Sequence, residues 1–257
     1  MAGDMQQKQA PLGALWLPAL VWSYGALGLA SLALYQIATP PPLLSPDLWE
    51  TVWAPATNSM HPHAQTVWGA VILIVYALLC LYLRECGVLS EVHRLGEFKP
   101  VHFPIIAGAV GGLYILDHYL LLLGIRVTGN VDFTLYNYGY EIPVTFENLF
   151  GELFSSVIAA PLFEELVFRG FLLGVLLARG WLPVQAVLAS SLLFALTHTQ
   201  YTAYGQLLIF LSGCVFAVLR LQTGGIRVPI LAHALLNLII TLAELQTGSG
   251  KSLIDSI

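Results

Sequence analysis

The chain has little charge of either sign and no block of basic or acidic residues. Only 10% of its 257 residues are charged, the formal net charge is −5, and hydrophobic residues make up 57%. With a mean hydropathy of +0.77, this is not the composition of a soluble globular domain. Without a basic run, the sequence predicts no nucleic-acid partner and no polybasic contact with anionic lipid.

Cysteine is also scarce, and the three residues present cannot pair completely. Cys80 and Cys214 lie in apolar runs, where a buried thiol acts as a small hydrophobic side chain, and Cys86 follows such a run. The sequence therefore predicts no disulfide framework.

Long apolar runs dominate the chain. About 20 apolar residues cross a bilayer core of about 30 Å, so the sequence predicts an all-α, polytopic transmembrane bundle of seven or eight spans. The first run exceeds the roughly 7–15 residues of a signal-peptide core and is expected to be a retained span. The fourth contains Pro161 and is too long for one ordinary crossing, so it is either a kinked span with an interfacial segment or two partial helices. The runs cover residues 12–38, 66–84, 104–124, 148–178, 181–198, 203–222 and 226–245.

The cations fall mostly on one side of a seven-span arrangement. That side carries Lys8, Arg84, Arg94, Lys99, Arg179, Arg220 and Arg227, and the other carries Arg126 and Lys251. Asp47, Glu50, Asp132 and Glu141 occupy the loops of the poorly charged side, 39–65 and 125–147. The positive-inside rule then predicts a cytoplasmic amino terminus and, with seven spans, an external carboxyl terminus.

Glu164, Glu165 and Arg169 interrupt the apolar fourth run. Ionised groups at mid-membrane are costly, so they normally face a partner or a cavity. Glu165 and Arg169 are four residues apart in the favourable order for a helical ion pair. Glu164 is turned about 100° from Glu165 on a helix, which predicts that the two carboxylates face different partners. An ion-paired brace between helices would also explain the three residues.

Two later runs carry polar residues one helical turn apart. The fifth ends with Phe194 and His198, and the seventh contains His233 and Asn237 on a single face. Singly, each polar residue is explained by hydrogen bonding between membrane helices. Together with the acidic pair and Arg169, they exceed what helix packing requires, and they suit activation of water for attack on a carbonyl.

Three functions remain open on these residues alone. In the first, Glu164 is a general base that shares a water with His198, and His233 and Asn237 stabilise the oxyanion. In the second, Glu164, His198 and His233 are zinc ligands, although the compact spacing of common zinc proteases is absent. In the third, the cluster belongs to a non-catalytic immunity protein, scaffold or small transporter.

The motifs Glu164-Glu165-x-x-x-Arg169, Phe194-x-x-x-His198 and His233-x-x-x-Asn237 resemble the signature of the CAAX protease and bacteriocin-processing enzyme superfamily. The resemblance implies a glutamic intramembrane endopeptidase of the type II CAAX prenyl endopeptidase kind, without a cofactor. It implies Glu164 and His198 as water-activating residues, His233 and Asn237 as the oxyanion site, and Glu165 with Arg169 as supporting residues.

The implied substrate is a membrane-embedded or lipidated protein or peptide: a prenylated Cys-a-a-X protein, a bacteriocin-type peptide or a sorting-signal protein. The expected location is a bacterial or archaeal cell membrane. The predicted organisation is a motif-free part at 1–147, a catalytic core at 148–245 and a tail at 246–257.

The third run adds an acid and an imidazole outside this signature, Asp117 and His118. They are expected to contact substrate or to support the site, as is Phe194, and a plain interhelical hydrogen bond explains the pair equally well. Gly108 and Gly112, four residues apart on the same run, predict close helix packing there.

Overall fold

A computed structural model describes residues 11–26, 28, 63–130, 133–135 and 146–246. Within these ranges every regular element is helical, which confirms the all-α class. The later part of the first apolar run, most of the loop 39–65 and the tail after residue 246 lie outside the described residues. The helices are η1 Leu12–Leu15, α1 Trp16–Tyr24, α5 Ala64–Glu85, α6 Leu89–Val92, α7 His102–Thr128, α8 Phe146–Glu152, η3 Leu153–Ala159, α9 Ala160–Glu164, η4 Glu165–Leu172, α10 Leu173–Ala178, α11 Pro183–Leu196, α12 Ala203–Thr223 and α13 Arg227–Gln246.

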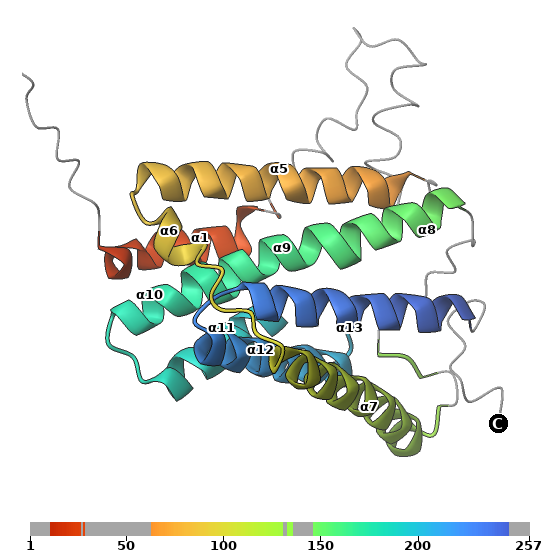
Figure 1. The fold of residues 1–257 in the computed structure, drawn as a ribbon. Helices are drawn as coiled ribbons and strands as arrows, with labels where there is room; N and C mark the ends of the chain where they lie inside the picture. The colour runs from red at the N-terminus through yellow and green to blue at the C-terminus, as the bar shows by residue number, and fades with distance from the viewer. Residues whose placement is uncertain (1–10, 27, 29–62, 131–132, 136–145, 247–257) are drawn as a thin grey trace, which may run out of the picture.

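The fourth apolar run forms one unbroken helical rod from Phe146 to Ala178, made of α8, η3, α9, η4 and α10 (Figure 1). Pro161 lies where the π-helical segment η3 passes into α9, and it does not break the rod. The two η segments are π-helical, a form that is rare and often found at functional sites. The run is therefore one long helix, and the alternative of two partial helices is wrong.

The rod is the centre of the bundle. α5 packs on one side of it and α13 on another, while α1 and α11 contact η4 (Figure 1). All eight residues of η4 are buried. A helix surrounded on every face can hold charged side chains away from lipid. The motif Glu164-Glu165-x-x-x-Arg169 lies in this surrounded part of the rod.

The outer helices begin and end at residues that favour helix ends. Pro183 occupies the first turn of α11, and the Thr202 side chain caps α12 by accepting a hydrogen bond from the Gly205 N–H at 3.4 Å. Gly129 and Gly224, with φ of 66° and 68°, end α7 and α12 in the left-handed conformation.

Three helices are long and apolar enough to cross a membrane: α5, α7 and α12. Shorter apolar helices cover Leu12–Tyr24, Pro183–Leu196 and Arg227–Ala243. Together with the central rod, these correspond to the seven apolar runs, and they describe a helical membrane protein.

The glycines of α7 do not support the close packing expected there. A Cβ added at Gly108 or Gly112 would meet nothing within 4 Å. This expectation was wrong within the described chain, because α7 contacts α12 and α13 through the opposite face, which carries Ile106, Val110 and Leu113.

Candidate active site

Glu165 and Arg169 form the predicted ion pair inside the central rod. Arg169 Nη1 lies 3.2 Å from Glu165 Oε1, and the two side chains are 1% and 0% exposed. The contact is electrostatic, since neither Arg169 Nη1 nor Nη2 makes a well-directed hydrogen bond. Burial this complete makes the pair mutually dependent, because either charge left alone would be strongly destabilising.

Aromatic rings surround Arg169, and Phe168 contributes one of them, with its ring centroid 5.9 Å from the guanidinium carbon. The same carbon lies 4.3 Å from the Phe194 ring centroid and 5.5 Å from that of Phe216. Such cation–π contacts stabilise a desolvated cation. Phe194 therefore supports the charged cluster and also lines the cavity described below. No sequence pattern singled out Phe216, because an aromatic residue in an apolar helix has many ordinary uses.

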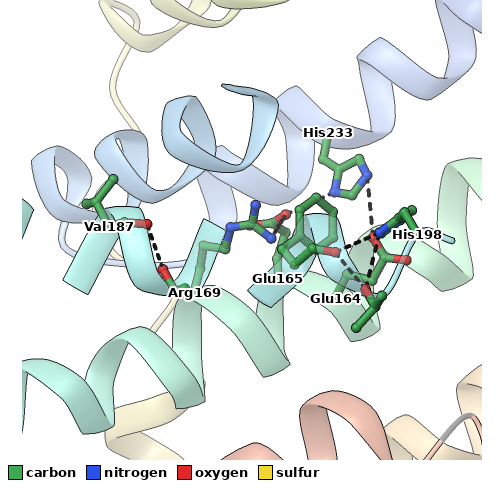
Figure 2. Close-up of polar contacts among 9 residues, drawn as sticks. Glu164, Glu165, Arg169, Val187, His198 and His233 are labelled. Carbon is green, nitrogen blue, oxygen red and sulfur yellow. Dashed lines mark hydrogen bonds and ion pairs between the residues drawn. The ribbon is translucent and has the colours of Figure 1, made fainter. Parts of the chain in front are cut away.

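The side chain of His233 extends from α13 and lies between the two glutamates (Figure 2). Its Nδ1 is 2.9 Å from Glu165 Oε1, and its Nε2 is 3.8 Å from Glu164 Oε2. The prediction that the two carboxylates face different partners is therefore wrong. One imidazole presents nitrogens in two directions, so carboxylates that diverge along the helix can still meet the same ring.

The contacts of His233 fix its orientation. Because an ionised Glu165 carboxylate only accepts hydrogen bonds, His233 Nδ1 carries the proton that it donates. The ring stacks on Phe216, with centroids 4.8 Å apart and planes 19° apart. Nε2 is left facing Glu164 across a gap longer than a hydrogen bond.

His198 is held by the helix that carries it, at the end of α11 (Figure 2). Its Nδ1 lies 2.8 Å from the carbonyl oxygen of Phe194, and the Thr197 hydroxyl is 3.2 Å from the same nitrogen. A carbonyl only accepts, so Nδ1 carries the proton and Nε2 of a neutral ring is an acceptor. The T-shaped contact with the Phe194 ring, at 4.6 Å, further fixes the imidazole.

Asn237 connects α13 to the central rod. Its Nδ2 donates a hydrogen bond of 2.7 Å to the carbonyl oxygen of Ser156, in the π-helical segment η3. An amide nitrogen has two N–H groups, so one remains for another acceptor.

One cavity of about 100 Å³ joins most of these groups. Its lining includes Glu164, His198, His233 and Asn237, and the structure therefore brings the four residues predicted to be catalytic to one space. Glu165 and Arg169 lie behind it in the core. Phe194, expected to contact substrate or to support the site, also lines the cavity. The lining residues that sequence reasoning missed are Tyr201, Leu208, Ile209, Ser212, Phe216, Leu236 and Ile240.

Asp117 and His118 are adjacent, but only one of them faces the cavity. Asp117 lines the same cavity from α7, and its side chain is 23% exposed. His118 does not line it, and its Nδ1 lies 3.1 Å from the Tyr114 carbonyl oxygen. The two side chains are 3.6 Å apart. Asp117 is thus placed to meet a bound molecule, and His118 is not.

In the described part of the chain, no group of three or more His, Cys, Asp or Glu side chains is placed to hold a metal ion. Of the three side chains considered for zinc, His233 donates its Nδ1–H to Glu165 and His198 donates its Nδ1–H to a backbone carbonyl, contacts that metal-ligating histidines also make.

Comparison with known proteins identifies the family. The model of the type II CAAX prenyl endopeptidase Rce1-like family matches residues 146–239. An Escherichia coli protein, "Uncharacterized 24.3 kDa protein", is 30% identical over 162 residues, which cover 62% of this chain and 72% of that protein. The chain belongs to the Rce1-like family.

This assignment covers all three motifs, because the matched residues run from before Glu164 to beyond Asn237. A Bacillus subtilis (strain 168) protein named "Putative membrane peptidase YdiL" is 26% identical over 197 residues, 74% of this chain and 76% of that protein. No solved structure matches the chain. The Rce1-like family is one of membrane proteases, and this chain is a membrane protein of that kind.

Proposed function

We propose that this protein is a glutamic intramembrane endopeptidase that cleaves a membrane-associated, prenylated protein near its carboxyl terminus. The observation that carries the proposal is the shared cavity, in which Glu164, His198, His233 and Asn237 meet. The family supplies the class of substrate, and the cavity supplies groups suited to hydrolysis of a peptide bond.

In this mechanism a water molecule is activated between Glu164 and His198. The Glu164 carboxylate takes one proton from water, and the acceptor Nε2 of His198 holds the water in place. The resulting hydroxide attacks the scissile carbonyl carbon, and the negative charge develops on its oxygen. The proton is then delivered to the leaving amine as the carbon–nitrogen bond breaks.

The oxyanion is stabilised from α13. The free N–H of Asn237 and a protonated Nε2 of His233 are the donors, and both residues line the cavity. With His233 protonated, the charges of Glu164, Glu165, Arg169 and His233 sum to zero. Moving the Nε2 proton to Glu164 leaves that sum unchanged, so proton transfer within the cluster creates no net charge in the membrane.

The test is cleavage of a prenylated peptide ending in Cys-a-a-X by purified protein, followed by mass spectrometry. We expect Glu164→Gln to lower the rate at least about a hundredfold, because general-base catalysis contributes roughly 10²–10⁴-fold. Glu85→Gln is the matched control, since Glu85 is an exposed glutamate at the end of α5 and its side chain is 68% exposed. A folded Glu164→Gln variant with full activity would contradict the mechanism.

The zinc alternative is separated in the same assay. Strong chelation and metal analysis of the active protein distinguish the two, because a zinc enzyme loses activity with its metal. Stoichiometric zinc with chelator-sensitive cleavage would replace the glutamic mechanism. If no cleavage occurs with any membrane-anchored substrate, the protein is a non-catalytic member of the family.

A further inference from the structure

Three arginines that are distant in sequence gather at one end of the bundle. Arg94 lies in the loop after α6, Arg220 in the last turn of α12, and Arg227 begins α13. Two backbone hydrogen bonds join these segments, from Ile226 N to Arg94 O at 2.8 Å and from Arg227 N to Leu95 O at 3.1 Å. The fold thus builds a basic cluster that no run of the sequence contains.

The loop after α6 crosses the loop between α12 and α13 with their backbones in close contact at Gly96 and Gly225. Gly96 has a φ of 74°, and a Cβ there would lie 2.5 Å from Gly225 N. A Cβ at Gly225 would lie 2.0 Å from Gly96 N. The close backbone contact and the two hydrogen bonds hold the arginine-bearing segments together.

The positive charges of the cluster are not balanced by acids in the described part of the chain. Arg94 is close enough to Arg220 for the two like charges to repel, and no salt bridge involves Arg94, Arg220 or Arg227 among the described residues. The nearby Glu97 is paired with Lys99 at 2.6 Å.

Arg220 gives the most specific indication of a ligand. Its Nε is buried and has no hydrogen-bond partner among the residues that the structure describes. A buried N–H of a charged group without an acceptor is costly, and it is costlier beside a second cation. An anion between Arg94 and Arg220 would remove both costs.

We propose that Arg94 and Arg220, with Arg227 beside them, bind the phosphate group of an anionic membrane lipid. Guanidinium groups match phosphate oxygens in pairs of parallel hydrogen bonds. The cluster stands where the apolar span α12 ends, which is the level of lipid headgroups, and the positive end of the α13 dipole adds to its potential.

Two of the three arginines, Arg220 and Arg227, are on α12 and α13, which also carry residues of the candidate active site. Arg220 follows Phe216 by four residues, and Phe216 stacks on His233. Arg227 precedes His233 by about 9 Å along α13, at 1.5 Å per residue. A bound phosphate would therefore hold the ends of α12 and α13 together. The lipid site does not depend on the proposed proteolysis.

The experiment uses the full chain purified in a neutral detergent. Native mass spectrometry and thermal unfolding are followed during titration with phosphatidylglycerol, with phosphatidylcholine and with inorganic phosphate. We expect phosphatidylglycerol to bind and raise the melting temperature, and phosphatidylcholine to do neither. Arg94→Gln and Arg220→Gln should each weaken phosphatidylglycerol binding by about tenfold, as expected for loss of a charged hydrogen bond.

Arg84→Gln is the matched control, because the Arg84 side chain is 64% exposed at the end of α5 and removal of its charge should leave binding unchanged. Equal weakening in Arg84→Gln would show attraction to surface charge alone and overturn the site. Equally tight binding of inorganic phosphate would overturn the lipid assignment. Both lipids carry a phosphate and only phosphatidylglycerol has a net negative charge, so equal binding of the two would overturn the assignment to an anionic lipid. If Arg220→Gln fails to fold, the exposed Arg94 decides the outcome.

Discussion

The buried charges of the central rod depend on one another at the level of single residues. Glu165 contacts both Arg169 and His233, so its carboxylate is the common partner of two groups that can be cationic. We expect Glu165→Ala to destabilise the protein by about 3–5 kcal/mol, because Arg169 would remain buried without its carboxylate. Thermal unfolding in detergent measures the loss.

A double substitution tests whether the loss comes from the unpaired charge. Glu165→Gln with Arg169→Met removes both charges and keeps similar volumes, so it should be more stable than Glu165→Ala alone. If the double variant is no better, the destabilisation arises from packing and not from the uncompensated guanidinium.

Asp117 and His118 should behave differently although they are adjacent. Asp117 lines the cavity, whereas His118 faces the backbone of its own helix. We expect Asp117→Asn to change kcat/KM for the prenylated peptide by about tenfold, the size of one charged hydrogen bond, and His118→Gln to change it little. A larger effect at His118 would contradict the assignment of the cavity wall.

The sequence was sufficient for interactions that depend on helical spacing. Glu165 and Arg169 were predicted as a pair because four residues make about one turn, and that holds wherever the helix lies. The position of His233 between both glutamates was not predictable, since it depends on how α13 packs against the rod. Phe216 carried no signal for the same reason.

At the scale of helices, the apolar runs of the sequence predict where the helices begin and end. They do not predict where the helix geometry changes locally. Hydropathy located α5, α7, α12 and α13 within a few residues. It gave no sign of the π-helical segments η3 and η4, because a change in backbone hydrogen bonding alters no residue type. At Gly108 and Gly112 the sequence carried a packing motif, but the helix does not pack closely there. Such a motif indicates only that close approach is allowed.

The crossing of the loops at Gly96 and Gly225 is the element-level contact most sensitive to a small change. We expect Gly225→Ala to destabilise the protein by about 1–3 kcal/mol, the usual cost of forcing atoms into a filled space. Gly108→Ala is the control, because its Cβ would meet nothing within 4 Å and alanine favours the helix. Similar melting temperatures for the two variants would contradict this contact.

For the whole molecule, the fold separates cationic and cation-poor ends. Figure 1 places the end of α5, the end of α10 and the start of α13 at one end of the bundle, which carries Arg84, Arg179 and Arg227. The start of α8 and the end of α13 lie at the opposite end. This agrees with the seven-span arrangement expected from the sequence, which put these three arginines on one side.

This asymmetry predicts that the cationic end faces the cytoplasm. The test replaces Cys80, Cys86 and Cys214 by alanine and introduces single cysteines as Lys99→Cys or Thr128→Cys, at opposite ends of α7. In intact cells, an impermeant maleimide should label the cysteine at position 128 and should reach the one at position 99 only after the membrane is opened. The reverse pattern would invert the protein and place Arg94, Arg220 and Arg227 in the outer leaflet, where the anionic lipid proposed for them would have to be found.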